Sequence, residues 1–292
     1  MNQALKDQRV QELISLYNNG DIKECLLRAK KVAKIYPEEP FVFNLIGVVS
    51  ASIGSYEEAI ESYKRALKIN PNYFEVYNNL GVALNDSKKP KDAISYLRKA
   101  LKINPHYPEA YNNLGNALKE IESLDQAIES YENAIKLNPK FIDPYTNLAI
   151  VFASKKNENE KAEYYFKKAL EISPENSEAL KYFSDFLVSI QRYSEAKALL
   201  EKCLILVPRN SDVLNLLGQV YKSENFEKAL EFYNNALHLS EDKESIQNNI
   251  GALYFEFNKV KRAISYFKKI SYSDGNTKTL LNLAYAYIAD NR

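Results

Sequence analysis

The sequence is poor in the residues that disulfide-bonded proteins and phosphate-binding loops require. Its 292 residues include only two cysteines, Cys25 and Cys203, which are too few for a disulfide framework. Both stand where other parts of the chain carry alanine, so we interpret them as small buried residues rather than a redox or metal pair. The eight glycines fit one repeating pattern, and neither GxGxxG nor GxxxxGK(S/T) occurs. We therefore expect no loop that cradles a phosphate.

Neither sign of charge is in excess, and long apolar runs are missing. The chain has 39 basic and 38 acidic residues, for a net charge of +1. Because phosphate binding needs a basic stripe, this balance argues against nucleic acid as a main partner. No stretch reaches the ~18 apolar residues of a membrane span, and the N-terminal segment lacks the apolar core of a secretory signal. We expect a cytoplasmic protein that has no membrane association.

The sequence offers no constellation of catalytic or metal-binding residues. The two histidines, His106 and His238, each fall near the end of an expected helix, and neither has a partner at ligand spacing. No nucleophile stands in a pattern that pairs it with a base. We therefore predict no catalytic residue, no metal site and no cofactor, so the chain is not expected to be an enzyme.

What the sequence does contain is a repeat, which its prolines mark. Six of them are separated by 34, 34, 34, 35 and 34 residues. A period near 34 residues indicates an array of small structural units rather than one compact domain. These prolines are Pro37, Pro71, Pro105, Pro139, Pro174 and Pro208.

Each period predicts two helices joined by a turn. Counted from the first residue of a block, apolar residues recur at positions 4, 7, 8 and 11 and again at 20, 24, 27 and 28. This is the spacing of amphipathic helices. A small residue at 8 and alanine at 20 let the two helices approach, an aromatic at 24 or 11 fills the remaining space, and proline at 32 ends the second helix. No sustained alternation predicts a strand.

The small residues at 8 and 20, the aromatic at 24, the alanine at 27 and the proline at 32 resemble the tetratricopeptide repeat family over essentially the whole chain. The resemblance implies an all-α, right-handed α-α superhelix of about eight helix pairs plus a final partial repeat. It implies one solenoid over residues 1–292, in which the first helix of each pair lines a concave groove. The repeats are placed at 6–39, 40–73, 74–107, 108–141, 142–176, 177–210, 211–243 and 244–276, with a partial one at 277–292.

Asparagines form a polar pattern on the first helices that packing does not demand. An amide has both donors and an acceptor, so a ladder with one amide per repeat can hold the backbone of an extended peptide. They are alternatively tolerated surface residues in a chain rich in asparagine and lysine. The ladder is interrupted at position 6 by Leu45, Tyr182 and Leu216. The candidate peptide-binding residues are Asn79, Asn113, Asn147, Asn249 and Asn282 at position 6, with Asn78, Asn112 and Asn116 near them.

A second resemblance supports the ladder. The runs FEVYNNLGVALN (74–85) and PEAYNNLGNALKE (108–120) are similar to the repeat superhelix of O-linked N-acetylglucosamine transferases. In that family, the asparagine before Leu-Gly holds acceptor polypeptides, and the resemblance transfers this role directly to Asn79 and Asn113. It applies more weakly to Asn147, Asn249 and Asn282, where one of the two following residues differs. Nothing in the chain resembles the catalytic domain of that family.

These patterns predict a protein–protein interaction scaffold that binds extended polypeptide segments in an asparagine-lined groove. The alternative is the substrate-recognition arm of a larger glycosyl- or sulfo-transferase whose catalytic domain is absent from this chain. A two-carboxylate clamp, which also occurs among tetratricopeptide repeats, fits less well because Asn282 stands where arginine is expected. A nucleic-acid-binding repeat would need a groove lined with lysine or arginine, and here the first helices carry asparagine and acids.

The last helical segment, TLLNLAYAYIA (279–289), is apolar nearly all round. Terminal repeats normally present a polar outer face. We therefore predict an exposed apolar patch on this segment, and either self-association through it or cover from a downstream segment.

Overall fold

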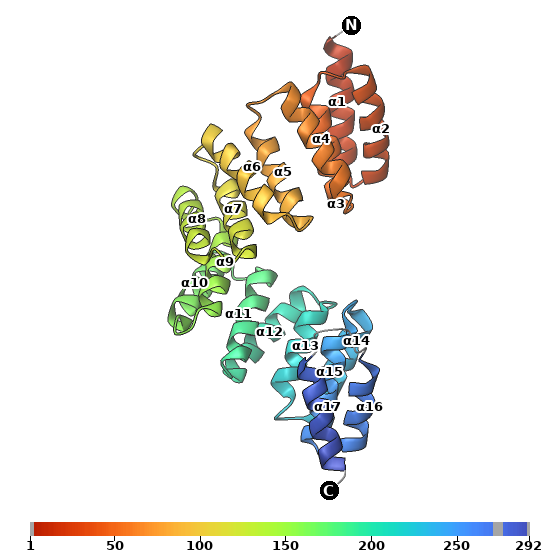
Figure 1. Cartoon of the computed structure of the whole chain (residues 1–292), viewed down its shortest axis with the longest axis vertical. Coiled ribbons are helices and arrows are strands. Elements are labelled where there is room, and N and C mark those ends of the chain that lie inside the picture. The colour runs from red at the N-terminus through yellow and green to blue at the C-terminus, as the bar shows by residue number, and fades with distance from the viewer. Residues whose placement is uncertain (1–2, 271–276, 291–292) are drawn as a thin grey trace. The chain divides into compact units, whose positions relative to one another are not determined.

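The structure, a computed structural model, describes residues 3–270 and 277–290. The chain divides into two compact units, 1–151 and 152–292, and each is considered by itself. All regular secondary structure in the described residues is helical (Figure 1). The all-α prediction is therefore confirmed.

The N-terminal unit contains α1 to α8 and most of α9, and the boundary between the units falls near the end of α9. The helices of this unit are α1 (Gln3–Asn18), α2 (Ile22–Ile35), α3 (Pro40–Ser52), α4 (Tyr56–Ile69), α5 (Phe74–Asp86), α6 (Pro90–Ile103), α7 (Pro108–Glu120), α8 (Leu124–Leu137) and α9 (Ile142–Ser154). The helices of the C-terminal unit are α10 (Asn159–Ile172), α11 (Ser177–Ser189), α12 (Tyr193–Leu206), α13 (Ser211–Tyr221), α14 (Phe226–Leu239), α15 (Lys243–Glu256), α16 (Val260–Lys269) and α17 (Thr277–Asp290).

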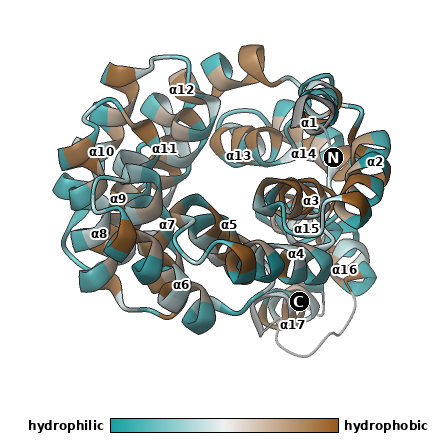
Figure 2. Ribbon diagram, turned by 90° about the horizontal axis from the view of Figure 1, so that it is seen from above, coloured by the Kyte–Doolittle hydropathy of each residue, from teal (hydrophilic) through white to brown (hydrophobic). Residues whose placement is uncertain are grey.

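In both units the helices follow one another as pairs, and α17 opens a further repeat among the described residues. Consecutive helices pack on each other, for example α5 on α6 and α6 on α7. Figure 2 separates the first helices α5 and α7 from the second helices α6 and α8, which lie on the other side of the stack. The predicted helix-pair solenoid is thus confirmed for the packing within each unit. The repeat limits drawn from the sequence, and one uninterrupted array over the whole chain, stay predictions.

The prolines at position 32 end the second helices as expected. Helix α4 stops at Ile69, two residues before Pro71, and α8 stops at Leu137, two residues before Pro139. The intervening Asn70 and Asn138 have extended backbones, with ψ of 93° and 92°. A residue that precedes proline is sterically kept out of the helical region, so the helix cannot continue.

The small residue at position 8 faces the large residue at position 24 of the same repeat. A Cβ atom added to Gly115 would lie 2.5 Å from the ring of Tyr131, and one added to Gly218 would lie 2.5 Å from the ring of Tyr233. Both tyrosines are almost fully buried. Glycine therefore lets the two helices of a pair approach until an aromatic ring fills the space between them, as the sequence predicted.

Cys25, like Cys203, is a buried free thiol.

The turn between the helices of a pair uses a left-handed residue in every described pair except α13–α14, and this residue is glycine only in the first two repeats. Gly54 has a φ of +76°, whereas Glu122 and Gln191 hold φ of +59° and +63° at the same place in later repeats. The N–H groups of Glu122 and Ser123 donate to the carbonyl oxygens of Lys119 and Leu118. These two bonds close the end of α7 in the manner of a Schellman motif.

Candidate functional site

In the N-terminal unit the predicted asparagines are hydrogen-bonded to each other across repeats. The Nδ2 of each position-6 asparagine donates to the Oδ1 of the position-5 asparagine in the preceding repeat. The distances are 3.2 Å from Asn79 to Asn44, 2.9 Å from Asn113 to Asn78, and 3.0 Å from Asn147 to Asn112. We call this row of side chains along α3, α5, α7 and α9 the asparagine face.

The C-terminal unit has a shorter row of the same kind. Asn249 donates to Asn215 over 2.9 Å, and Asn282 donates to Asn248 over 3.1 Å. The Asn248 Oδ1 also accepts from the hydroxyl of Thr279 over 3.2 Å. These bonds join α13 to α15 and α15 to α17, so the C-terminal unit has a separate row of asparagine pairs on three successive first helices.

The two asparagines of a pair differ in exposure where the acceptor is Asn78, Asn112 or Asn248. Asn78, Asn112 and Asn248 at position 5 are nearly buried, and their carbonyl oxygens are the acceptors. Asn113 and Asn147 at position 6 are half-buried, and each donates one N–H of its amide to the preceding repeat. The other N–H and the Oδ1 of these two amides have no partner among the described residues. Each can therefore make further hydrogen bonds to a ligand or to water.

Asn116 does not join this row. Its Oδ1 accepts a hydrogen bond of 2.8 Å from the hydroxyl of Tyr131, the buried tyrosine on α8. Burial places that hydroxyl in an apolar surrounding and raises the pKa of Tyr131. The amide of Asn116 thus satisfies a polar atom inside its own repeat, a role that the sequence pattern did not indicate.

The cross-repeat bonds are a structural role that neither sequence interpretation included. A hydrogen bond between neutral groups contributes about 1 kcal/mol net, and an orphaned buried acceptor costs about 1–3 kcal/mol. The asparagine pairs therefore help to hold successive repeats in register as well as presenting amides to solvent. A spacing of about one repeat between donor and acceptor is the sequence signal that points to such pairs, for example Asn79 with Asn44.

A hollow of about 210 Å³ lies on the same face in the C-terminal unit, where position 6 carries Tyr182 and Leu216 instead of asparagine. Lys181 reaches across it to Asp212, with 3.4 Å between Nζ and Oδ2, and its ammonium lies 4.5 Å from the ring centre of Tyr182. The remaining lining residues are Asp185, Asn215 and Gln219. All of them occupy positions 2, 5, 6 or 9 of α11 and α13, a set that includes the two positions of the asparagine pairs.

Carboxyl groups on this side of the first helices are partly desolvated. Burial raises the pKa of Asp86, Asp143 and Asp185 above its ordinary value. At Asp185 the charge of Lys181 opposes this rise and the charge of Asp212 adds to it. A cation or a hydrogen-bond donor that approaches such a carboxylate stabilises its charged form, because it replaces the water that the carboxylate has lost on burial.

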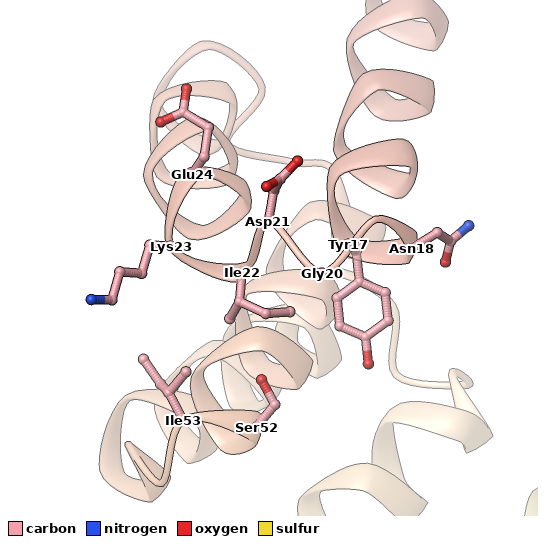
Figure 3. A pocket seen from close by; sticks show the side chains of 9 residues that line it. All are labelled: Tyr17, Asn18, Gly20, Asp21, Ile22, Lys23, Glu24, Ser52 and Ile53. Atoms are coloured by element: carbon pink, nitrogen blue, oxygen red, sulfur yellow. The ribbon is translucent and has the colours of Figure 1, made fainter.

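A larger hollow, of about 880 Å³, lies elsewhere, at the turn between α1 and α2. It is lined by Tyr17, Asn18, Gly20, Asp21, Ile22, Lys23, Glu24, Ser52 and Ile53. Figure 3 shows the polar ends of Asn18, Lys23 and Glu24 pointing in three different directions. Since these groups do not converge on a common point, the hollow has no set of polar atoms that would orient a ligand.

Some predictions concern features beyond the asparagines. In the described part of the chain, no cluster of three histidine, cysteine or acidic side chains could hold a metal ion. Likewise, none of the described helices is long and apolar enough to cross a bilayer. The exposed apolar patch predicted on the last helix is confirmed: Leu280, Leu281 and Ile288 of α17 are about half exposed.

Comparison with protein-family models finds repeats along both units. A model described as TPR repeat matches residues 47–87, one described as tetratricopeptide repeat matches 74–107 and 108–141, and a further tetratricopeptide repeat model matches 153–220. No curated protein sequence matches the chain significantly.

Solved structures with the same architecture are numerous. A crystal structure of MamA is 31% identical, covers 55% of this chain and 93% of its own, and superposes with a TM-score of 0.50. A repeat protein from Parabacteroides merdae is 18% identical, with coverage of 85% and 98% and a TM-score of 0.64. The APC/C hetero-tetramer Cut9–Hcn1 is 18% identical, with coverage of 98% of this chain and 57% of the matched chain and a TM-score of 0.73. The last two likenesses, below 25% identity, concern the fold alone.

Proposed function

Because the chain belongs to the tetratricopeptide repeat family, whose fold typically serves as a non-catalytic scaffold for protein interaction, we propose that it binds an extended polypeptide segment along the asparagine face. The observation that carries this proposal is the half-exposed row of position-6 amides. Each is fixed by its bond to the preceding repeat and keeps hydrogen-bonding capacity for a ligand.

The spacing of the row suits an extended peptide backbone. Adjacent packed helices lie about 8–10 Å apart, and an extended chain advances about 3.3 Å per residue. One amide of the row would therefore meet every third residue of the peptide. An amide can donate to a peptide carbonyl and accept from a peptide N–H, so the contact does not depend on the peptide's side chains.

The expected affinity is low. Three amides in the N-terminal unit that make two bonds each contribute about 6 kcal/mol at about 1 kcal/mol per bond. Association costs at least about 4 kcal/mol. The remainder of at most about 2 kcal/mol corresponds to a Kd no tighter than roughly 30 mM, so other contacts have to supply affinity and specificity. For a segment bound to the C-terminal unit, we propose the hollow lined by Asp185 and Asp212 as such a contact.

A peptide selection tests the proposal. A phage-displayed library of random 12-residue peptides is selected on the intact chain, and the Kd of a selected peptide is measured by fluorescence anisotropy. In the triple variant Asn79→Ala, Asn113→Ala and Asn147→Ala we expect at least a tenfold weaker Kd, because both the cross-repeat bonds and the exposed amides are lost.

The matched control is the triple variant Asn44→Ala, Asn78→Ala and Asn112→Ala. It breaks the same three cross-repeat hydrogen bonds but keeps the position-6 amides. We expect a smaller loss of affinity in this control. Equal losses in the two variants, or no selected peptide that is sensitive to either, would show that the asparagines serve only to join repeats.

The alternative of a recognition arm of a larger transferase stays a prediction from the sequence. It would use the same face for an acceptor polypeptide.

A further inference from the structure

The hollow between α11 and α13 in the C-terminal unit has room for one side chain of a ligand. Its volume is about 210 Å³, below the roughly 300–1,000 Å³ of pockets that hold small molecules. The charged groups that line it are Lys181, Asp185 and Asp212. Because two carboxylates face one ammonium, one negative charge is left over, and the hollow favours a cationic occupant. We call it the α11–α13 hollow.

Lys181 compensates Asp212 and leaves Asp185 without a partner. Its Nζ lies 3.4 Å from the Oδ2 of Asp212. Among the described residues, no group donates a hydrogen bond to the Asp185 carboxylate or forms an ion pair with it. Burial raises the pKa of Asp185, and the residue is still accessible to solvent. Asp185 has therefore lost water on folding, and a ligand can reach it and take the place of that water.

The fold does not require a carboxylate at this position. Asp185 is the ninth residue of α11, beyond the first turn in which the helix dipole favours an acid. Aspartate is also a weak helix former. In the other first helices, position 9 carries apolar or aromatic residues or neutral amides, for example Val48, Val82 and Asn116. Packing and helix formation therefore leave the carboxylate unexplained, and its place in the wall of a hollow points to a ligand.

An arginine side chain matches the remaining groups of the α11–α13 hollow. Its planar guanidinium donates two parallel hydrogen bonds to one carboxylate, which a lysine ammonium cannot do. It is also more weakly hydrated than an ammonium, so it loses less on entering a partly desolvated site. Gln219, whose side chain makes no hydrogen bond among the described residues, offers a further acceptor. Leu216 offers an apolar surface for the methylene stem.

We propose that the α11–α13 hollow binds the side chain of one arginine from an extended polypeptide that lies along the C-terminal unit. Asp185 accepts two parallel hydrogen bonds from the guanidinium, Gln219 accepts a third, and the methylene stem lies on Leu216. This deepens the proposed function and rests on it for the polypeptide, because the hollow recognises only the side chain. It gives the C-terminal unit a preference for sequence that rows of amides cannot supply.

A capped arginine without the rest of a polypeptide is the probe. Nα-acetyl-arginine N-methylamide is titrated at constant ionic strength into the intact ¹⁵N-labelled chain, up to about 100 mM because a single side chain binds weakly. The side-chain amide signals of Asn215 and Gln219, assigned from Asn215→Ser and Gln219→Ser, report the hollow. The signal of the exposed Asn235 on α14 is the reference. We expect the first two signals to shift to saturation and the third to stay.

Two further probes separate charge from shape. The citrulline analogue has nearly the same shape as arginine but no charge, and it should bind at least fivefold more weakly. The lysine analogue keeps the charge but cannot donate two parallel hydrogen bonds to one carboxylate, and it should bind at least twofold more weakly.

Two variants of the chain should move the affinity for the arginine probe in opposite directions. Asp185→Asn keeps the shape of the hollow and removes the charge, and it should weaken binding at least fivefold. Lys181→Met removes the competing ammonium and should strengthen binding at least twofold. The matched controls Glu231→Gln and Lys202→Met remove the same charges from exposed sites on α14 and α12 and should leave the Kd unchanged. A misfolded chain would not bind more tightly, so Lys181→Met tests the proposal whatever Asp185→Asn does to stability.

Several results would overturn the proposal. Absence of a saturable shift in the two hollow signals would do so, as would equal binding of the arginine and citrulline analogues. Lysine binding as tight as that of arginine would remove the assignment to arginine. Equal losses in Asp185→Asn and Glu231→Gln would show that the overall charge of the unit, and not the hollow, attracts the probe.

These outcomes are separate from the test of the asparagine face, which uses a selected peptide and variants of the N-terminal unit. If the arginine probe does not bind but a selected peptide is sensitive to the position-6 triple variant, the proposed function stands without this contact. If the probe binds and no selected peptide is sensitive to that variant, the hollow is a site and the asparagine face is not.

Discussion

The two units join their repeats by a different balance of neutral and charged contacts. In the N-terminal unit, α3, α5, α7 and α9 are linked in succession by neutral amide pairs. In the C-terminal unit, Tyr182 and Leu216 replace the amide donor in two repeats, so the amide pairs join only α13 to α15 and α15 to α17. Charged pairs also span the repeats there. These pairs are Arg192 with Glu163, Lys181 with Asp212, Lys197 with Glu224, and Lys222 with Glu256.

The difference indicates that register between repeats can be fixed by either kind of contact, provided that the helix-pair core is the same. A hydrogen bond between amides is indifferent to salt and to pH. An ion pair at a partly exposed site is screened by salt and is lost when the carboxylate is protonated. The units are therefore expected to respond alike to changes in their cores and differently to changes in solvent.

The largest effect should be shared by both units. In Gly115→Val and in Gly218→Val, the new side chain meets a tyrosine ring whose atoms lie 2.5 Å from the first added carbon. Overpacking of this kind costs about 1–3 kcal/mol. We expect losses near the upper end in both variants, measured by urea unfolding followed by circular dichroism.

A double-mutant cycle tests the cause. Combining Gly115→Val with Tyr131→Ala should cost at least 1 kcal/mol less than the sum of the two single changes, because the valine can occupy the space of the ring. Additive losses would show that the clash with the ring is not the cause. A loss in only one of the two units would show that the cores are not equivalent.

The next effect is a loss of stability whose dependence on salt should differ between the two units. Asn112→Ala removes the buried acceptor of Asn147, and we expect a loss of about 1 kcal/mol. Because both partners are neutral, the difference from the unaltered chain should be the same in low salt and in 1 M NaCl. The exposed Asn235→Ala on α14 is the control and should cost less than half as much. A loss that shrinks with salt would contradict the neutral-pair interpretation.

A smaller effect belongs to the C-terminal unit and depends on pH. Hydrogen bonds from Arg192 and then Lys167 lower the pKa of Glu163 to about 2 from an ordinary value of 4.5. A carboxylate with a lowered pKa stabilises the fold above its unfolded pKa, and this contribution disappears as pH falls through the folded value. Glu163→Gln should cost about 1 kcal/mol at pH 7, since Arg192 is partly exposed.

The measurement is urea unfolding of the unaltered chain and Glu163→Gln from pH 7 to pH 2. The difference in free energy of unfolding should be constant down to about pH 4.5 and should narrow below it. It should also decrease in 1 M NaCl, unlike that of Asn112→Ala. A difference that persists unchanged at pH 2 would exclude the ion pair as its source.

Much of this fold can be predicted from the sequence because the residues that determine packing recur at the same positions in several repeats. Proline at position 32 predicts where α4 and α8 end, and glycine at position 8 predicts the contact with Tyr131 or Tyr233. Both rules act within one repeat, where residue spacing fixes the geometry. The division of the chain into two units has no such local signal, and the sequence did not indicate it.

The candidate site was only partly predictable. The sequence identified the asparagines but treated each as a separate amide, because position 5 and position 6 of one helix do not reveal contact with the next repeat. The pairing of Asn113 with Asn78 depends on the packing of α7 against α5. The hollow between α11 and α13 likewise arises from side chains of two repeats, so neither repeat alone predicts it.

The smallest effect concerns the turns, whose backbone strain the sequence does not reveal at all. Glu122 in one unit and Gln191 in the other hold left-handed φ of +59° and +63°, where a Cβ atom is unfavourable. Glu122→Gly and Gln191→Gly should each raise the free energy of unfolding by about 0.5–1 kcal/mol, because relief of that strain exceeds the added entropy of the unfolded chain.

Gly54→Ala provides the reverse test by the same urea unfolding. Gly54 holds a φ of +76°, and an added Cβ there would meet no atom within 4 Å, so any loss must come from the backbone alone. We expect a loss of about 1 kcal/mol. If Gly54→Ala were neutral while the two glycine variants were stabilising, relief of backbone strain could not be the reason for their gain in stability.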